Sequence, residues 1–403
     1  MSQVLAGVRL IEVADWGFVP SAAAAISDWG ADIIKIEHPV YGDPMRGLIT
    51  SGLIPGASGI NFFMAQIARN KKSVGIDLNA EEGRRILYRL VEKADIFLTN
   101  YLPSARKKLK IDADVIRGIN PKIIYAKGHG QGQKGPDADK GGYDGCSFWA
   151  RGAVANRLSP PGEQPITQRP AFGDFISGMF TAGGIAAALY HRERTGEGCE
   201  VDVSLLAAAC WVMSPDIVAA MTYGFELPPA MRGMVPNPIV NTYECKDGKY
   251  LTLMMLQFER FWALFAKTVE REDWLANPDW DTPEKRKSAG PWIVDAVAEH
   301  FKTRDRAEWE GILRASDCIW APVASPIEIQ HDPQVIANGY LMDYDDGQGN
   351  KTKVCSSPVQ FDGEAFRVRS RAPDAGEHTE EVLLEAGFGW DDIGRWKEAG
   401  VIS

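Results

Sequence analysis

Short apolar runs alternate with amphipathic or small-residue stretches through the first 130 residues. The runs are rich in branched aliphatic side chains, which favour strands: VRLIEVA, DIIKIE, SVGIDL, DIFLTN and KIIYAKGHG. The stretches SAAAAISDWG and AEEGRRILYRLVEKA predict helices, and Asn79 with Glu82 has the form of a capping box before the second. Short connections between strands and helices in this order indicate a parallel, Rossmann-like α/β sheet.

A long helix is predicted from Asp174 to Leu189, where small side chains recur every four residues at Gly178, Ala182 and Ala186. That spacing places them on one face and lets the helix pack closely against a neighbour. The sequence CEVDVSLL then predicts a further buried strand, and AAACWVMSPDIVAAM a following helix.

The pattern changes after residue 221, where a Pro- and Met-rich stretch with little periodicity predicts a linker. TYECKDGKYLTLMML then predicts a hairpin around Lys246, Asp247 and Gly248, and three amphipathic helical stretches follow it. We therefore expect a large α/β domain over 1–221, a linker over 222–240, a small α+β domain over 241–330, and a return segment over 331–403 that completes the large domain from residue 340.

Composition narrows the class of protein. A net charge of −10 and a pI near 5.3 argue against nucleic-acid binding, which needs a basic face. The segment MSQVLAGVRLIEVA lacks the features of a signal peptide, and no stretch reaches about 18 uninterrupted apolar residues. We expect a cytoplasmic protein that binds neither nucleic acid nor membrane.

Metal and nicotinamide chemistry find little support. The six cysteines show no C-x-x-C spacing and are expected to be free thiols, and no H-x-x-x-H pair suggests a metal site. Glu37 ends the second strand as a ribose-binding acid would, but the first turn reads DWGFVPS and lacks the glycines that a pyrophosphate needs. We expect neither a metal nor a nicotinamide cofactor.

Three features remain as candidates for chemistry. The basic clusters NKKS (70–73) and ARKKLK (105–110) suit phosphates, although a solvated surface run is the commoner explanation of such clusters. His129 follows a strand in a glycine-rich stretch, where an ordinary loop histidine is the favoured interpretation. Asp174 precedes a helix as a favoured N-cap would, and such a carboxylate beside Gly173 is exposed enough to attack a carbonyl while it stays ionised at pH 7.

Several segments in order resemble the family III CoA-transferases, the CaiB/BaiF type that includes the carnitine and formyl-CoA transferases. They are LAGVRLIE, GADIIKIE, GDPMRG, NKKSVGIDL, ADIFLTNY, GYD at 142–144, FGDFISGM, CEVDVSLL and the later DPQ at 332–334. The resemblance implies a transferase that moves CoA from an acyl-CoA thioester to a free carboxylic acid. Coenzyme A is then the substrate carrier, and Asp174 matches the nucleophile that becomes acylated.

The resemblance also implies a CoA site on the large domain. Its contacts would be Trp16 and Gly17 near the thioester, His38 near the nucleotide, Lys71, Lys72 and Lys108 at the phosphates, Asn100 and Tyr101 at a strand end, and Tyr143. The family forms interlocked-ring homodimers, and we expect the same here, with the site completed by the small domain of the partner.

Two departures bear on the reaction. Tyr143 stands where related α-methylacyl-CoA racemases carry a histidine, which removes a base for α-proton abstraction. The apolar residues Met254, Met255, Leu256 and Phe258 replace a glycine-rich flap and suit a bulky aliphatic or aromatic acyl group better than oxalate or formate. The segments GYDGCSFWARGA and PNPIVNTYECKDG resemble the branch that acts on aryl-acrylate or 2-hydroxy acids, and carnitine-like or steroid acids are equally compatible with an apolar pocket. A racemase-like isomerase and a non-catalytic CoA-binding protein stay open as alternatives.

Overall fold

The computed structural model describes residues 3–48, 59–227 and 237–403. It divides into two compact units, a larger one over Met1–Leu227 and Pro333–Ser403 and a smaller one over Pro228–Asp332. Of the linker predicted over 222–240, residues 228–236 lie outside the described residues. The two units are described separately below.

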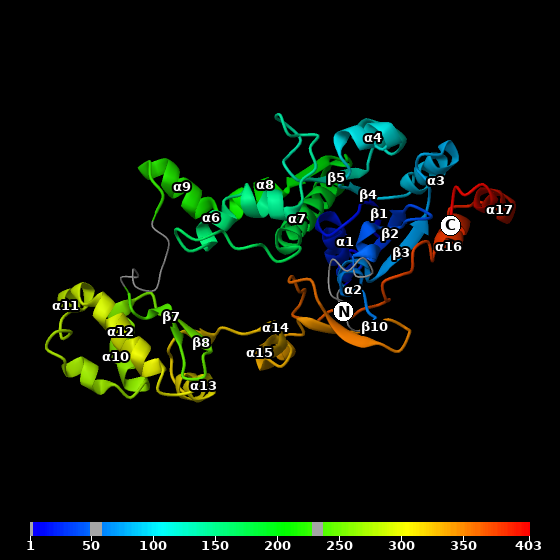
Figure 1. Cartoon of the computed structure of the whole chain (residues 1–403). Coiled ribbons are helices and arrows are strands. Elements are labelled where there is room, and N and C mark those ends of the chain that lie inside the picture. Colours follow the sequence, from blue (N-terminus) through cyan, green and yellow to red (C-terminus); the bar gives the residue numbers. More distant parts are fainter. Residues whose placement is uncertain (1–2, 49–58, 228–236) are drawn as a thin grey trace. The chain divides into compact units, whose positions relative to one another are not determined.

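Six parallel strands form the centre of the larger unit, in the order β3-β2-β1-β4-β5-β6 (Figure 1). The strands are β1 (Arg9–Val13), β2 (Asp32–Glu37), β3 (Lys71–Gly75), β4 (Ile96–Thr99), β5 (Ile124–His129) and β6 (Glu200–Ser204). This is the strand order of Rossmann-type sheets, in which the chain changes direction between β1 and β4. The prediction of a parallel α/β fold is confirmed.

Helices cover both faces of this sheet, and each face has its own apolar core. Leu10, Ile33 and Leu98 pack beneath α1 and α7 on one face, and Ile11, Ile34 and Phe97 pack beneath α3, α5, α16 and α17 on the other. Burial of both faces explains why the strands read as nearly continuous apolar runs. The helices of this unit are α1 (Phe18–Asp28), α2 (Phe62–Ala68), α3 (Glu81–Val91), α4 (Pro103–Leu109), α5 (Ala113–Ile119), α6 (Val154–Leu158), α7 (Phe172–Thr195), α8 (Leu205–Val212), α9 (Ser214–Tyr223), α15 (Pro333–Ala337), α16 (Thr379–Glu385) and α17 (Trp390–Glu398), with a 3-10 turn η1 (Pro44–Gly47) and a π-helical turn η2 (Gly145–Ala150).

The C-terminal segment packs on the sheet edge formed by β3. The amide of His378 donates to the carbonyl of Ser73 at 2.9 Å, and Ile402 forms an antiparallel bridge with Ile76. A two-stranded hairpin, β10 (Leu341–Asp345) with β11 (Lys351–Cys355), precedes this contact. Residues more than 300 positions apart therefore share one core.

Helix α7 packs closely along α1, as its small residues predict. Gly178 lies so near to Ser21 and Phe18 of α1 that a Cβ atom would collide with them, and Ala182 is fully buried. By length and composition alone α7 could cross a membrane, yet its apolar side chains pack against α1, β5 and β6. Its apolar character serves the core of this unit.

Two local predictions were wrong. Helix α3 starts with Ala80 as its N-cap, while the Asn79 side chain donates to Asp77 Oδ1 at 2.9 Å, so the capping box does not form. Strand β6 is half-exposed rather than buried because it lies at the edge of the sheet, and Glu200 and Asp202 alternate with its apolar residues.

The smaller unit contains a three-stranded antiparallel sheet in the order β7-β8-β9, and the predicted hairpin is confirmed. Aromatic side chains such as Trp262 and Phe301 fill its core. Met255 is fully buried there, so the prediction that it contacts an acyl group is wrong. Its elements are β7 (Val240–Glu244), β8 (Tyr250–Met254), α10 (Phe258–Thr268), η4 (Glu272–Ala276), α11 (Pro283–Ser288), α12 (Gly290–Phe301), α13 (Arg306–Arg314), β9 (Trp320–Pro322) and α14 (Pro326–Ile329).

Candidate active site

A cavity of about 400 Å³ opens at the carboxyl ends of β1, β4 and β5 in the larger unit. Ligands of open α/β sheets bind at this edge, beside the point where the strand order reverses. Polar and apolar side chains both line it: Asp15, Trp16, Phe18, Asn100, Tyr101, Leu102, Ala105, Leu109, His129, Tyr143, Asp174 and Leu205, together with glycines of β5 and of residues 141–142. The geometry marks this cavity as the candidate active site.

Asp174 enters the cavity from the first turn of α7. A Cβ atom at Gly17 would lie 2.6 Å from Asp174 Oδ2, so the carboxylate rests directly against the backbone of the turn between β1 and α1. Gly173 is packed just as closely on the Phe148 ring. Only glycine fits at position 17 without moving the carboxylate.

The N-cap role predicted for Asp174 is wrong. The N-cap of α7 is Ala171, in the left-handed conformation at φ 63°, and Asp174 is the third residue inside the helix. The Asp174 carboxylate accepts no hydrogen bond from the residues that the structure describes. A ligand could therefore contact it without displacing a hydrogen bond from these residues.

Burial and the negative charge of Asp144 raise the pKa of Asp174 from 3.8 to about 8. Asp144 itself is held by the Gln168 side-chain amide and by the backbone amide of Gly145. A helix N-terminus favours an anion, but here desolvation outweighs it. The expectation that Asp174 is ionised at pH 7 is thus wrong for the free protein, and the carboxyl must lose a proton before it can act as a nucleophile.

A buried ionic cluster fixes the turn that carries Trp16 and Gly17. Lys35 Nζ lies 2.9 Å from both Glu12 Oε1 and Asp43 Oδ2, and Asp43 Oδ1 accepts from the Trp16 amide at 3.2 Å. Trp16 has a positive φ of 68°, a conformation that costs a non-glycine residue of order 1 kcal/mol or more unless its surroundings enforce it. The hydrogen bond from the Trp16 amide to Asp43, which is itself paired with Lys35, holds Trp16 in this conformation.

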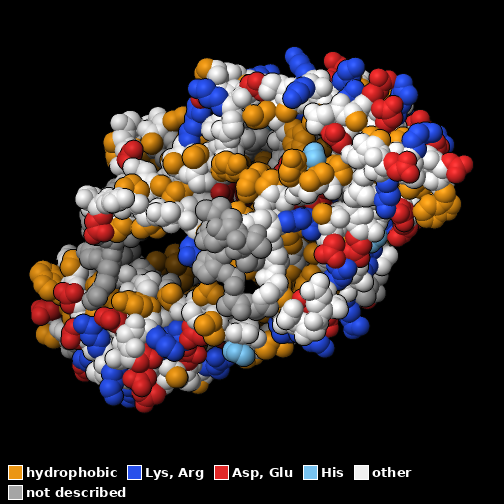
Figure 2. Space-filling model, turned by 45° about the vertical axis from the view of Figure 1, so that its right-hand side comes forward, with side chains coloured by type: hydrophobic (Ala, Val, Ile, Leu, Met, Phe, Trp, Pro, Cys, Tyr) orange, Lys and Arg blue, Asp and Glu red, His pale blue; other side chains and the backbone are white. Residues whose placement is uncertain are grey.

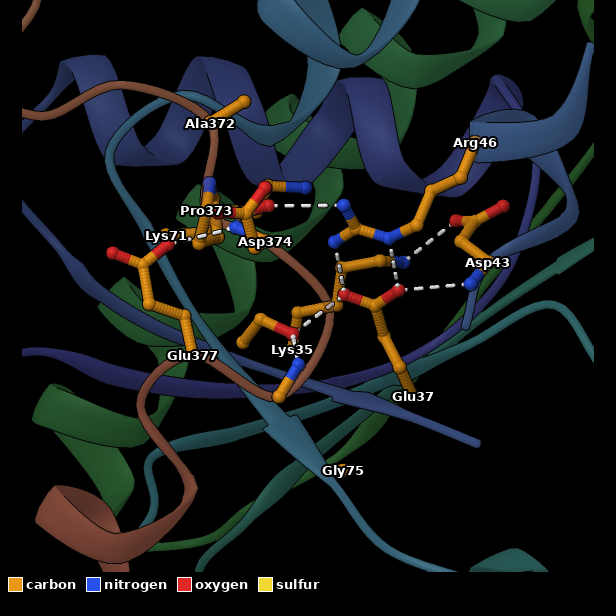
Figure 3. Close-up of polar contacts among 12 residues, drawn as sticks. Lys35, Glu37, Asp43, Arg46, Lys71, Gly75, Ala372, Pro373, Asp374 and Glu377 are labelled. Atoms are coloured by element: carbon orange, nitrogen blue, oxygen red, sulfur yellow. Dashed lines mark hydrogen bonds and ion pairs between the residues drawn. The ribbon is translucent and has the colours of Figure 1, made fainter. Parts of the chain in front are cut away.

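Figure 3 shows how the same cluster continues to the C-terminal segment. The Arg46 guanidinium donates two hydrogen bonds to the Glu37 carboxylate, at 2.8 and 2.6 Å, and a third to the carbonyl of Pro373 at 3.0 Å. Burial alone would raise the pKa of Glu37, but the hydrogen bond from Arg46 and the charges of Lys35 and Arg46 lower it to about 2. Both oxygens of the Glu37 carboxylate are thus already paired with Arg46.

Five of the residues expected at the CoA site meet at the cavity with Asp174. Trp16, Asn100, Tyr101 and Tyr143 line it, and Gly17 lies against the Asp174 side chain. The Trp16 and Tyr143 rings meet edge to face, 5.6 Å apart.

The remaining expected contacts lie outside the cavity lining. The predicted phosphate contact of Lys71 is wrong, because its side chain is fully buried, with Nζ 2.6 Å from Glu12 Oε2 and 2.9 Å from the Pro20 carbonyl. Lys72 is paired with two glutamates, Glu381 and Glu385. A lysine in the first position of a strand points into the structure as readily as out of it, which a basic run in the sequence does not reveal.

His38 and Lys108 are the accessible members of the expected set. The His38 ring follows β2 and lies 4.7 Å from the ring of Tyr41. Lys108 is exposed on α4, the helix whose Ala105 and Leu109 line the cavity.

Two titratable side chains of the cavity, Asp15 and His129, were not assigned to the site from the sequence. Asp15 follows β1, and burial together with the charge of Asp43 raises its pKa to about 6. His129 is the last residue of β5 rather than part of a loop, and its Nε2 lies 2.8 Å from Asp202 Oδ2. Asp202 is 73 residues away in the chain, so no local pattern could pair the two.

Comparisons with known proteins show the family to which the chain belongs. The family model described as CoA-transferase family III matches residues 5–379. The chain is 32% identical over 400 residues to an (R)-2-hydroxy-4-methylpentanoate CoA-transferase from Clostridioides difficile, with 99% of each chain covered. It is 32% identical over 394 residues to a cinnamoyl-CoA:phenyllactate CoA-transferase from Clostridium sporogenes, covering 97% of this chain and 95% of that one. A crystal structure of a CAIB/BAIF family protein from Brucella suis matches with a TM-score of 0.82 at 25% identity, covering 96% of this chain and 100% of the other.

Proposed function

Because the chain belongs to CoA-transferase family III, we propose that it transfers CoA between an acyl-CoA thioester and a free carboxylic acid through covalent intermediates on Asp174. The observation that carries this proposal is the Asp174 carboxylate, which is unpartnered among the described residues, lines the cavity and rests against Gly17. A carboxylate in that position can approach a bound carbonyl without first breaking an internal hydrogen bond.

The transfer balances without a metal or an external energy source. Asp174 attacks the thioester carbonyl, the C–S bond breaks, and CoA leaves as a thiolate while a mixed anhydride forms on the aspartyl group. The thiolate then attacks the aspartyl carbonyl, which releases the donor acid as a carboxylate and leaves an aspartyl-CoA thioester. The acceptor carboxylate attacks this thioester, and the returning thiolate cleaves the new anhydride at the acyl carbonyl. Acyl-CoA leaves, and Asp174 is restored.

The CoA phosphates fit best near α4 in this proposal. Lys108 is exposed on this short helix, and Lys107 and Lys110 are exposed beside it. The same helix lines the cavity through Ala105 and Leu109. A pantetheine arm reaching from the cavity over α4 would carry its phosphates to these ammonium groups. His38 stays a candidate for the nucleotide end.

The cavity favours a bulky apolar acyl group. Its lining includes Trp16, Phe18, Leu102, Leu109 and Leu205. The two curated relatives carry names that pair CoA transfer with branched or aryl acids bearing a hydroxyl group. We infer a substrate of that class, an aryl or branched acid with or without a hydroxyl. A racemase-like reaction is the weaker candidate, because Tyr143 stands at the position of the expected base.

We also propose a cytoplasmic homodimer with interlocked chains. Figure 2 shows hydrophobic side chains gathered between charged ones on one face of the molecule. Helices α8 and α9 leave several large apolar side chains exposed, among them Trp211, Val218, Met221 and Tyr223. Exposed apolar surface of this kind is typical of a subunit interface. Light scattering of the purified protein would test the dimer.

Intact-protein mass spectrometry tests the reaction. The wild type and Asp174→Ala are incubated with a panel of acyl-CoAs and quenched with hydroxylamine or borohydride. We expect a mass change localised to Asp174 with at least one acyl-CoA and none in the variant. Solvent deuterium entering the α-carbon, with Asp174 unlabelled, would instead support the racemase.

A further inference from the structure

Several polar side chains of the cavity form hydrogen bonds with other residues of the protein. Asn100 accepts from the Asp15 amide at 3.1 Å and donates to the Asp15 carbonyl at 2.7 Å. The Asp15 carboxyl is hydrogen-bonded to the Tyr101 hydroxyl. Among the described residues, the cavity side chains that still carry a polar atom without a hydrogen-bond partner include Asp174, His129, Tyr143 and the Trp16 indole.

Among these side chains, His129 is fixed by a contact with the carboxylate of Asp202. Its ring is almost fully buried at the end of β5, and Nε2 lies 2.8 Å from Asp202 Oδ2 on the neighbouring strand β6. Asp202 has Lys127 Nζ at 3.9 Å as well, while Lys127 is committed to Glu200. Asp202 therefore orients the imidazole, since an unprotonated carboxylate can only accept.

The contact between Nε2 and Asp202 determines whether the other ring nitrogen, Nδ1, donates or accepts a hydrogen bond. In a neutral imidazole one nitrogen donates and the other accepts. In the neutral tautomer in which Nε2 donates to Asp202, Nδ1 is left as an acceptor. Nδ1 has no hydrogen-bond partner among the described residues and is not one of their buried, unsatisfied atoms, so solvent or a ligand reaches it.

The backbone around His129 has no room to adjust. A Cβ atom at the next residue, Gly130, would lie 2.6 Å from the Gly142 Cα, so the end of β5 is pressed against the segment that carries Tyr143. An imidazole fixed on one side by Asp202 and held by this packing is pre-organised to recognise a ligand.

We propose that His129 is a specificity-determining residue whose Nδ1 accepts a hydrogen bond from a hydroxyl on carbon 2 of the acid bound in this cavity. This inference rests on the proposed function and names the substrate class within it, a 2-hydroxy acid. The remainder of the lining is largely apolar, so an acid that lacks the hydroxyl leaves Nδ1 without a partner. An enzyme site built to bind a hydroxyl discriminates strongly against the analogue without it.

The test compares acids that differ only in that hydroxyl. CoA transfer is measured to 2-hydroxy-4-methylpentanoate and 4-methylpentanoate, and to 3-phenyllactate and 3-phenylpropanoate, with both enantiomers of each hydroxy acid. The donor is whichever acyl-CoA labels Asp174. We expect wild-type kcat/KM to favour one hydroxy acid over its deoxy partner by about tenfold or more. In His129→Phe the ratio should fall to within about threefold of one.

A donor group on CoA itself, such as a pantetheine amide N–H, is the other source of the same hydrogen bond. In that case His129→Phe lowers kcat/KM equally for hydroxy and deoxy acids, and the inference is overturned. His331→Phe, an exposed histidine with no side-chain contact among the described residues, is the matched control and should leave every ratio unchanged. An unchanged ratio in His129→Phe would equally overturn it.

A measurement on the wild-type protein does not depend on the variant folding. Nitrogen-15 NMR of the histidine side chains, assigned with His129→Gln as a second variant, should show His129 with a protonated Nε2 and a bare Nδ1. The Nδ1 resonance should shift on addition of a hydroxy acid and not of its deoxy partner. A protonated Nδ1 in the free protein contradicts the inference. Absence of any label on Asp174 would refute the proposed function instead, and the NMR titration would still test His129.

Discussion

Replacing Asp174 by asparagine should stabilise the larger unit, and the gain should grow with pH. The substitution keeps the shape of the side chain and removes the ionisable group that burial and Asp144 disfavour in its charged form. Below pH 4 both the folded and the unfolded wild type carry a neutral Asp174, so the variant and the wild type should differ little.

The sign and size follow from linkage. The pKa of Asp174 is raised in the folded protein, from 3.8 to about 8, so the folded state holds its proton while the unfolded state loses it. Between these two values the wild type loses stability at up to about 1.4 kcal/mol per pH unit, and above pH 8 the loss is complete. The full shift corresponds to about 5 to 6 kcal/mol, but the carboxylate is only half-buried, and solvent near it reduces the penalty. We expect Asp174→Asn to be more stable by about 2 to 3 kcal/mol at pH 8 and by less than about 1 kcal/mol at pH 4.

Urea denaturation at pH 4.5, 6, 7 and 8, followed by tryptophan fluorescence at one fixed protein concentration, measures the difference. Glu163→Gln removes a carboxylate from an exposed loop of the same unit and serves as the matched control. The reasoning is refuted if the advantage of Asp174→Asn stays constant or shrinks as the pH rises. Asp144→Asn should weaken the trend, because it removes the charge that adds to desolvation at Asp174.

Three further changes test other parts of the site. Gly17→Ala should lower kcat by at least about tenfold while the melting temperature changes little, because its Cβ displaces the Asp174 carboxylate; Gly118→Ala, where a Cβ meets nothing, should leave both unchanged. Lys71→Met should destabilise the protein by roughly 3 kcal/mol in urea, since it breaks a fully buried ion pair with Glu12. The exposed Lys108→Met should instead weaken CoA binding in calorimetry without a change in stability. In wild type, kcat/KM should rise about tenfold per pH unit towards a plateau above about pH 8, as the pKa of Asp174 requires; a flat profile from pH 6 to 8 would contradict this.

The sheet was predictable because its signal is local. Each buried strand needs a run of apolar residues, and each connection is short enough to keep a strand and its helix adjacent in the sequence. The close packing of α7 was predictable for the same reason, since Gly178 and Ala182 recur at the helical period. Strand β6 was read as buried because its composition does not reveal whether a second strand lies beyond it.

The environment of each charged group was not predictable. Lys71 and Lys72 are neighbours in the sequence, yet one is enclosed with Glu12 and the other faces the glutamates of α16. Alternation along a strand puts adjacent side chains on opposite faces, so a basic dipeptide at a strand start cannot supply two phosphate contacts. Position relative to the sheet, rather than composition, decides which lysine a ligand can reach.

Desolvation links the stability of this protein to its chemistry. The contact of Asp174 with Gly17, the nearby charge of Asp144 and the largely apolar lining raise the pKa and so disfavour the carboxylate. The same surroundings deprive that carboxylate, once formed, of hydrogen bonds that would have to break before it attacks a carbonyl. A more polar pocket would hold the anion at lower pH but would also solvate it. Under the proposed function, the cavity trades folding stability for a reactive carboxylate, and removing the charge should stabilise the fold and abolish the reaction together.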